Sequence, residues 1–262
     1  MDISLKGKNA IICGSSRGIG KAVALEMANN GANITLIARD EKLLKSVCKE
    51  LHNNGTQKHG YIVVDFSQPL KLKEKIKKHI RNNSPVHILI NNTGGPKPGE
   101  ILNADISEFR EAFEKHIICN QILVQAIVPG MKKAKYGRII NIISTSVKEP
   151  IDRLGVSNTI RAAVASWAKT LSRELAPFGI TVNNILPGAT RTARLTSLIE
   201  SRSKSYNLTF NDAENEWLSI IPAGRFAVPE ELANVISFLA SPAASYVNGV
   251  SLPVDGGRTK SL

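Results

Sequence analysis

Short apolar runs alternate with helical patterns along almost the whole chain of 262 residues, and this alternation restricts the fold more than any other feature. Apolar strands separated by helices form a parallel sheet whose two faces are both covered. We therefore predict one doubly wound α/β domain over residues 1–262, with a seven-stranded parallel sheet and helices on both faces. The predicted strands are Ala10–Cys13, Ile34–Ala38, Tyr61–Val64, His87–Ile90, Arg138–Ile143, Thr181–Ile185 and Ser251–Val254. The predicted helices span about 19–29, 41–53, 69–82, 107–132, 157–177 and 229–240.

One segment, at about 191–222, interrupts the alternation. It is polar and helix-prone, and it follows the sixth predicted strand. Open α/β sheets bind ligands beyond the carboxyl ends of their strands. We therefore expect a lid-like insertion over a ligand site, or alternatively a plain pair of surface helices.

The net charge of +12 raises the question of a polyanionic partner. The densest basic run, Lys71–Lys78, fits a helix with a solvated face, because its lysines surround Leu72 and Ile76. No nucleic-acid module accompanies this run, and only 5% of residues are aromatic, so stacking platforms are few. The sequence therefore disfavours a nucleic-acid partner, and the charge can instead serve an acidic cofactor or substrate.

The remaining composition indicates an ordinary globular protein of the cytoplasm. The first residues have neither the pattern of a signal peptide nor that of a membrane span, so no membrane partner is expected. Cys13, Cys48 and Cys119 are widely spaced, which predicts buried free thiols. No spacing of ligands suggests a metal site.

A glycine-rich turn, CGSSRGIG at 13–20, joins the first predicted strand to the first helix. Its glycines permit a tight turn and a close approach of the backbone to a diphosphate, while the helix N-terminus offers unpaired N–H groups to the anion. Strand, turn and helix stand in the order that such a site requires. The turn therefore predicts dinucleotide binding by a Rossmann-type domain.

The end of the second predicted strand bears on which dinucleotide binds. An acidic residue there holds the ribose 2′-hydroxyl of NAD(H), whereas arginine accommodates the 2′-phosphate of NADP(H). Here Ala38 is followed by Arg39, and Asp40 stands where it could simply cap the next helix. Arg17 adds a second cation in the turn. We therefore expect NADP(H) to be favoured over NAD(H).

Motifs spread along nearly the whole chain resemble those of the short-chain dehydrogenase/reductase family, and in particular its 3-oxoacyl-(acyl-carrier-protein) reductase branch. The resemblance rests on the glycine pattern Gly14-x-x-x-Gly18-x-Gly20, on Asp65, on the motif at 91–94, on the motif at 187–192, on Glu230 and Glu231, and on the signature at 254–257. It implies that Asp65 contacts the adenine and that Thr192 holds the nicotinamide amide. The cofactor-binding residues it implies are Gly14, Ser16, Arg17, Gly18, Ile19, Gly20, Arg39, Asp65, Phe66, Asn92, Gly94, Arg161, Pro187, Gly188, Thr190 and Thr192.

The same resemblance implies a catalytic site at 144, 157, 161 and 116, where that family has an Asn-Ser-Tyr-Lys tetrad. The serine follows the run GRIINIIS and corresponds to Ser144. The tyrosine and lysine positions, thirteen and seventeen residues later, hold Ser157 and Arg161, and the asparagine position holds His116. Only one of the four members is therefore unchanged.

These replacements alter the acid–base chemistry. In the family, the lysine places a cation near the tyrosine. A cation about 4 Å away at an effective dielectric near 20 contributes about 4 kcal/mol, or about three pKa units, which lowers the pKa of the tyrosine from about 10 to about 7. A serine hydroxyl starts near the pKa of water, about 15.7, so Ser157 can donate a hydrogen bond but cannot be a tuned acid. Arg161 keeps a positive charge that can grip ribose hydroxyls. His116 has an unperturbed pKa of about 6.5 and is either the proton source or a satisfied core residue.

Two functions fit these observations. The first is an NADP(H)-dependent oxidoreductase that transfers hydride to or from a carbonyl or alcohol, 3-oxoacyl-thioester-reductase-like, with an atypical catalytic site. Its substrate would be a small molecule or an acyl thioester. The alternative is a catalytically silent NADP(H)-binding protein, such as a sensor or an assembly partner. The family resemblance further implies a homotetramer.

Overall fold

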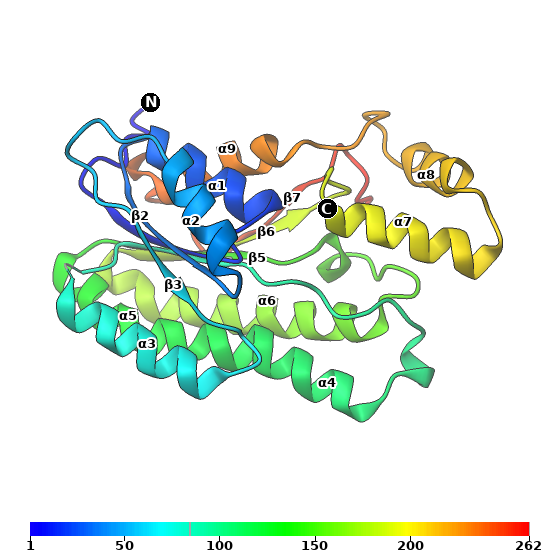
Figure 1. The fold of residues 1–262 in the computed structure, drawn as a ribbon, viewed down its shortest axis with the longest axis horizontal. Helices are drawn as coiled ribbons and strands as arrows, with labels where there is room; N and C mark the ends of the chain where they lie inside the picture. The colour runs from blue at the N-terminus through cyan, green and yellow to red at the C-terminus, as the bar shows by residue number, and fades with distance from the viewer. Residues whose placement is uncertain (84, 262) are drawn as a thin grey trace.

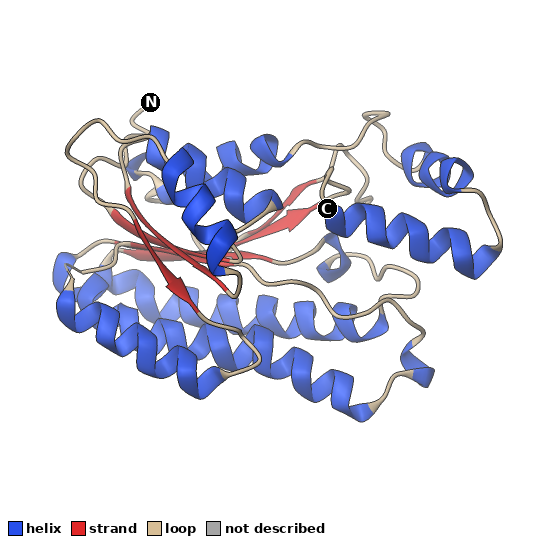
Figure 2. Cartoon of the chain, in the orientation of Figure 1, coloured by secondary structure: helices blue, strands red, loops and turns tan. Residues whose placement is uncertain are grey.

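Seven parallel strands form one sheet in the computed structural model, which describes residues 1–83 and 85–261. The strand order is β3-β2-β1-β4-β5-β6-β7, and every neighbouring pair is parallel. The predicted Rossmann-like α/β fold is therefore confirmed (Figure 2). The strands are β1 (Asn9–Cys13), β2 (Asn33–Ala38), β3 (Gly60–Val63), β4 (Ile88–Asn91), β5 (Gly137–Ile142), β6 (Ile180–Pro187) and β7 (Ser251–Val254).

Helices cover both faces of this sheet (Figure 1). Successive side chains of a strand point to opposite faces, so Ile12 packs in the core on one face and Ile11 in the core on the other. One face carries α1 (Gly18–Asn29), α2 (Glu41–Glu50) and α9 (Pro229–Ala240). The other carries α3 (Pro69–Asn82), α5 (Cys119–Ala134) and α6 (Gly155–Leu175).

The order of the strands reverses between β1 and β4, because the chain crosses from one side of β1 to the other. Such a switch point leaves a crevice outside the carboxyl ends of the strands. The turn after β1 and the loop after β4 border this crevice. The fold therefore predicts where a ligand binds before any side chain is considered.

A ladder of hydrogen bonds from asparagine side chains crosses four neighbouring strands. Asn91 Nδ2 donates to Asn141 Oδ1 at 2.8 Å, and Asn141 Nδ2 donates to Asn184 Oδ1 at 2.9 Å. Asn184 Nδ2 then donates to Ser251 Oγ at 3.1 Å. These residues are in register across β4, β5, β6 and β7. Asn91 Oδ1, at the end of the ladder, has no partner among the described residues. The three bonds of the ladder favour this one register of the strands beneath the crevice.

Two helical segments differ from the prediction. The helix expected over 107–132 is two helices, α4 (Ile106–Phe113) and α5, joined by a π-helical turn at Glu114–Ile118. The helix expected over 41–53 ends at Glu50, because Asn53 Oδ1 accepts from Gly55 N and so competes with helical hydrogen bonding. Most other boundaries move by only one or two residues.

The insertion expected at 191–222 contains α7 (Ala193–Tyr206) and α8 (Phe210–Ser219). The two helices extend beyond one end of the sheet (Figure 1). They share a small apolar cluster of their own, with Leu195, Ile199 and Ala213 buried. None of the helices over 1–83 and 85–261 is long and apolar enough to cross a membrane.

The three cysteines are free, but they differ in burial. Cys13 and Cys119 are buried, as predicted, on β1 and α5. Cys48, on α2, is only half-buried, so the prediction of burial is wrong for this residue. In the described part of the chain, no group of three or more metal-ligating side chains could hold a metal ion.

Candidate functional site

A cavity of about 390 Å³ lies at the carboxyl ends of the strands. Its wall includes the turn after β1, the loops after β4, β5 and β6, the first turns of α6, and side chains from α7 and α8. Most of the predicted site residues line it: Gly14, Arg17, Gly18, Ile19, Asn92, Gly94, Ser144, Ser157, Arg161, Pro187, Gly188, Thr190 and Thr192. Ser16, Gly20, Arg39, Asp65, Phe66 and His116 lie outside its wall.

The glycine turn brings the backbones of β1 and β4 into close contact. Gly14 has φ +58°, and a Cβ there would lie 2.6 Å from Asn92 O. A Cβ on Gly20 would overlap the carbonyl oxygen of Gly14. Gly18, with φ +53°, begins α1. Glycine is therefore required at these positions by space and by backbone conformation.

The start of α1 is suited to bind an anion. Arg17 is the N-cap residue, and no side chain caps the first N–H groups of the helix. These unpaired donors and the helix dipole favour a phosphate group at this point. Gly94, on the facing loop, has open space where a side chain would stand. The turn, the helix start and the cavity beside them therefore fit a dinucleotide.

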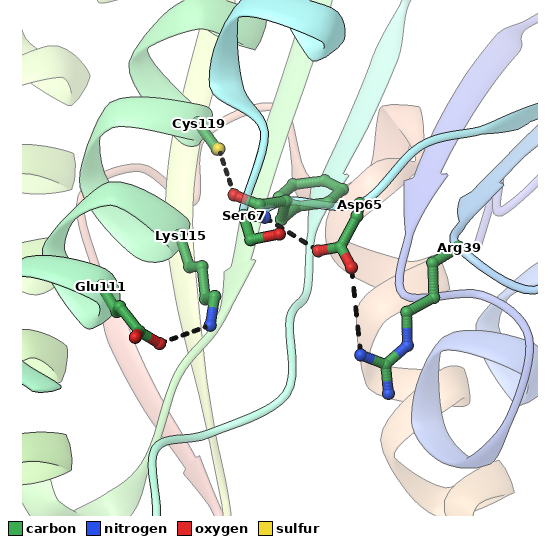
Figure 3. A network of polar contacts seen from close by, with 7 residues as sticks. Arg39, Asp65, Ser67, Glu111, Lys115 and Cys119 are labelled. Carbon is green, nitrogen blue, oxygen red and sulfur yellow. Dashed lines mark hydrogen bonds and ion pairs between the residues drawn. The ribbon is translucent and has the colours of Figure 1, made fainter.

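Arg39 and Asp65 lie outside the cavity, beyond the ends of β2 and β3 (Figure 3). Arg39 Nη1 lies 4.0 Å from Asp65 Oδ2, and the Arg39 side chain is 81% exposed. The pKa of Asp65 is lowered, chiefly because the N–H of Ser67 donates to its carboxylate. Asp40 caps α2 by accepting from Leu43 N at 3.1 Å, as its position suggested. Arg39 is therefore the side chain at this strand end that can turn toward a ligand.

Ser144, Ser157 and Arg161 all line the cavity. Ser144 follows β5 and its Oγ accepts from Ser146 N at 3.0 Å. Ser157 and Arg161 share a face in the first turns of α6, and both are 7% exposed. Within the described chain, the hydroxyl of Ser157 has no hydrogen-bond partner. It is therefore available to a bound molecule.

Arg161 is a buried cation that contacts only neutral groups. Nη1 donates to Ile142 O at 3.1 Å and Nη2 donates to Thr93 O at 3.4 Å. Its Nε has no partner, and none of the described carboxylates forms an ion pair with it. Burial, and then the charge of Arg194, lower the pKa of Arg161 to about 10, so it stays charged at neutral pH. A buried unpaired cation is costly, and a bound polar or anionic group would reduce that cost.

His116 lies behind the cavity wall, in the π-helical turn. It is 2% exposed, and its Nδ1 is 2.6 Å from Thr93 Oγ1. Burial lowers the pKa of His116 well below its usual range, and the positive charges of Arg161 and Lys115 lower it further. The imidazole is therefore neutral at neutral pH. Thr93, which does line the cavity, separates it from any ligand.

Four polar residues of the cavity wall were not predicted: Thr93, Thr145, Arg194 and Arg258. Each lies within or just after a motif or residue that the sequence marks, at 91–94, 144, 187–192 or 254–257. Proximity to a motif was the available signal, since the contacts that bring these side chains together come from distant parts of the chain.

Comparison with known proteins agrees with this geometry. The family model described as Enoyl-(Acyl carrier protein) reductase matches residues 14–259. The 3-oxoacyl-(acyl-carrier-protein) reductase of Vibrio cholerae is 31% identical over 257 residues, which cover 97% of this chain and 98% of that protein.

Solved structures are similar over the same length. L-sorbose reductase from Gluconobacter frateurii, in complex with NADPH and L-sorbose, is 31% identical with a TM-score of 0.92, and the match covers 100% of both chains. A short-chain type dehydrogenase/reductase from Mycobacterium marinum is 30% identical with a TM-score of 0.86, over 99% of this chain and 98% of that one. Since the matched region contains the glycine turn, the strand ends and the cavity wall, the chain belongs to the short-chain dehydrogenase/reductase family of oxidoreductases.

Proposed function

We propose that this protein is an NADP(H)-dependent oxidoreductase that transfers hydride to or from a carbonyl or alcohol through an atypical catalytic site. The observation that carries the proposal is that Ser144, Ser157 and Arg161 line the same cavity as the glycine turn. The similarity to a reductase solved with NADPH and L-sorbose supports it.

The cofactor would lie from the end of β2 to the start of α6. The N–H groups of α1, with Arg17, would bind the diphosphate, and Arg39 would meet the 2′-phosphate. Asp65 would contact the adenine, Arg161 the ribose near the nicotinamide, and Thr192 the nicotinamide amide. The remaining contacts would come from the other predicted cofactor residues: Gly14, Ser16, Gly18, Ile19, Gly20, Phe66, Asn92, Gly94, Pro187, Gly188 and Thr190.

When bound, NADPH supplies a hydride to a carbonyl carbon. The side chains of this protein must then stabilise negative charge on the carbonyl oxygen. Ser144 and Ser157 would donate hydrogen bonds to that oxygen, and the fixed charge of Arg161 would lower the energy of the developing alkoxide. Neither serine can be a tuned acid, because the pKa of an alcohol is close to that of water, about 15.7.

The proton must reach the oxygen by another route. His116 is neutral and hydrogen-bonded to Thr93, so we propose that it acts through Thr93 Oγ1, which lines the cavity. Thr93 is an alcohol like the two serines, so its hydroxyl would act as a relay: it would give its proton to the alkoxide as it takes one from water, and solvent would be the source of the proton. In this proposal His116 is a positioning residue for Thr93 rather than a direct donor.

A second candidate is a catalytically silent NADP(H)-binding protein. It is favoured by the low pKa of His116, because no side chain predicted for catalysis then titrates near neutrality. Loss of a positioned general acid typically costs about 10²–10⁴ in rate.

Steady-state consumption of NADPH separates the two candidates. The wild type should reduce at least one member of a panel of small ketones, sugars and 3-oxoacyl thioesters, with turnover saturating in both substrates. If NADPH binds tightly and no carbonyl compound is reduced, the silent binder is correct.

The same proposal includes a lid and a homo-oligomer in the cytoplasm. Arg194 on α7 donates to Pro96 O at 2.7 Å, so the inserted helices already contact the loop on the other side of the cavity. Ile106 and Phe113 are exposed on α4, which suits a contact between subunits. Light scattering should report a tetramer, and a monomer would exclude the oligomer.

A further inference from the structure

The charges lining the cavity are all positive within the described residues. Four arginines contribute to its wall, Arg17, Arg161, Arg194 and Arg258, and neither aspartate nor glutamate does. Two nearby arginines outside this cavity are paired with carboxylates: Arg153 with Glu100 at 3.1 Å and Arg202 with Glu216 at 2.6 Å. The four arginines of the wall have no such ion pair among the described residues.

Arg161 and Arg194 flank the same glycine. The position of a Cβ on Gly95 lies 3.3 Å from Arg194 Nη2 and 3.8 Å from Arg161 Nη2. Two like charges held this close repel each other, and a bound anion would relieve that repulsion. Within the described part of the chain, no carboxylate forms an ion pair with Arg194; its Nη2 donates instead to the backbone carbonyl of Pro96.

Arg258 contacts the segment that follows Ser144. Its Nη1 donates to Thr145 Oγ1 at 3.1 Å, and its buried Nε has no partner. Asp255 is near enough for the charge of Arg258 to help lower the pKa of that carboxyl, but its oxygens accept from Gly257 N and Thr259 N. The guanidinium of Arg258 therefore retains donors for a ligand.

The proposed cofactor accounts for two of the four arginines. Arg17 faces the diphosphate and Arg161 the ribose. Arg194 stands two residues after Thr192, and Arg258 contacts the residue after Ser144. Both line the cavity next to predicted site residues, and the proposed cofactor gives neither of them an anion.

Apolar side chains also line the cavity. Ile151, Leu154, Leu198 and Trp217 contribute to the wall. Such a surface accommodates a hydrocarbon or aromatic body, while a guanidinium group binds a carboxylate through two parallel hydrogen bonds.

We propose that the substrate is an oxo acid, or in the reverse direction a hydroxy acid, whose carboxylate is bound by Arg194 and Arg258. This inference rests on the proposed function and names the substrate class of that site. Hydride from NADPH adds to the carbonyl carbon, the C=O π bond breaks, and the oxygen takes a proton that solvent replaces. Carbonyl is reduced to alcohol and NADPH is oxidised, while the carboxylate stays unchanged and holds the molecule in place.

Matched acids and esters test the proposal. Benzoylformate and benzoylacetate are compared with their ethyl esters as substrates of the wild type with NADPH. Each charge-assisted hydrogen bond favours the acid, so kcat/KM for at least one acid should exceed that of its ester by about tenfold or more. Arg194→Met and Arg258→Met should each raise the KM of the acid and so move the acid-to-ester ratio of kcat/KM toward one. Arg173→Met, an exposed arginine of α6 outside the cavity wall, should leave the ratio unchanged.

A binding measurement separates failure of this inference from failure of the proposed function. Phenylacetate and phenylacetamide are titrated into the NADPH complex while nicotinamide fluorescence is followed. If no carbonyl is reduced but phenylacetate binds about tenfold more tightly, and Arg194→Met removes the difference, the carboxylate site stands without the activity. Equal or undetectable binding of both, or reduction of the esters as fast as the acids, overturns the inference. So does a loss of NADPH affinity in both variants with an unchanged acid-to-ester ratio.

Discussion

His116 Nδ1 lies 2.6 Å from Thr93 Oγ1, which joins a buried imidazole on the π-helical turn to a hydroxyl that lines the cavity. The carbonyl of the same threonine accepts from Arg161 Nη2. Thr93 therefore connects the two polar side chains that flank the proposed reaction site. A disturbance at His116 should reach the substrate through this residue.

Replacing His116 by alanine should lower kcat by a factor of about 10² or more and leave NADPH affinity intact. Thr93→Val should have a similar effect, because it keeps the shape of the side chain and removes the hydroxyl. His116→Gln can still hydrogen-bond Thr93 and should recover part of the rate. The pH dependence of kcat in the three variants is the second readout. An unchanged rate in His116→Ala would mean that the proton comes directly from water.

His116 should also make the fold less stable in acid. The pKa of this imidazole is lowered in the folded protein, whereas in the unfolded chain it is about 6.5. Below that pH the unfolded chain binds a proton that the folded one does not. The free energy of unfolding therefore falls by about 1.4 kcal/mol for each further pH unit, until the folded imidazole protonates.

Urea unfolding of the wild type and His116→Gln at several pH values measures this contribution. Because His59, His79 and His87 also have lowered pKa values, the quantity to compare is the difference between the two pH profiles. The difference in unfolding free energy between wild type and variant should shrink as the pH falls below about 6.5. Only the wild type loses stability there through protonation of His116 in the unfolded chain. Parallel profiles would contradict a depressed pKa at His116.

The fold follows from the sequence because the signals that determine it are local. Each strand is a short apolar run, as in Ala10–Cys13, and the glycine turn identifies the switch point without any tertiary information. The amide ladder is different. Asn91, Asn141 and Asn184 are polar residues within apolar strands, and only the register of the sheet reveals that they pair.

The site was predictable only where a motif marks it. Ser157 and Arg161 are four residues apart, so their common face is a property of the helix alone. His116 and Thr93 are separated by 23 residues, and no local sequence pattern marks the π-helical turn that orients the imidazole. The convergence of Arg194 with Arg161 likewise depends on how α7 packs over the sheet.

Arg39 should determine the preference between the two dinucleotides. Its contact with Asp65 is exposed and long, so it can leave that partner for a phosphate at little cost. We expect NADPH to bind more tightly than NADH by about 1–3 kcal/mol, and Arg39→Ala to remove most of this difference. Calorimetry with both cofactors measures it, and NADH affinity is the internal control. Equal affinity in the wild type would mean that Asp40 binds the ribose.

Arg161→Ala should weaken NADPH binding by about tenfold or more, because it removes a charged contact to the ribose. Arg161→Lys keeps the charge and should retain part of the affinity. Arg161→Ala should also raise the pKa of His116, since the positive charge of Arg161 helps to lower that pKa. NMR titration of the imidazole is a readout independent of the cofactor. A weaker affinity with an unmoved imidazole pKa would argue against the proximity of the two side chains.

The double variant Ser157→Tyr with Arg161→Lys tests whether the wild-type site is adapted or decayed. A phenol with an ordinary pKa of about 10, next to a cation, becomes a usable acid near neutrality, which serine cannot. In an adapted site the new ring would enter the space that the substrate occupies beside Ser144, so we expect the double variant to lose activity on the wild-type substrate. NADPH oxidation by both proteins against the same carbonyl panel is the measurement, with Ser157→Tyr alone as the control for steric effects. Strong reductase activity in the double variant of a wild type that reduces nothing would mean that the site has decayed, and the protein would then be a silent NADP(H) binder.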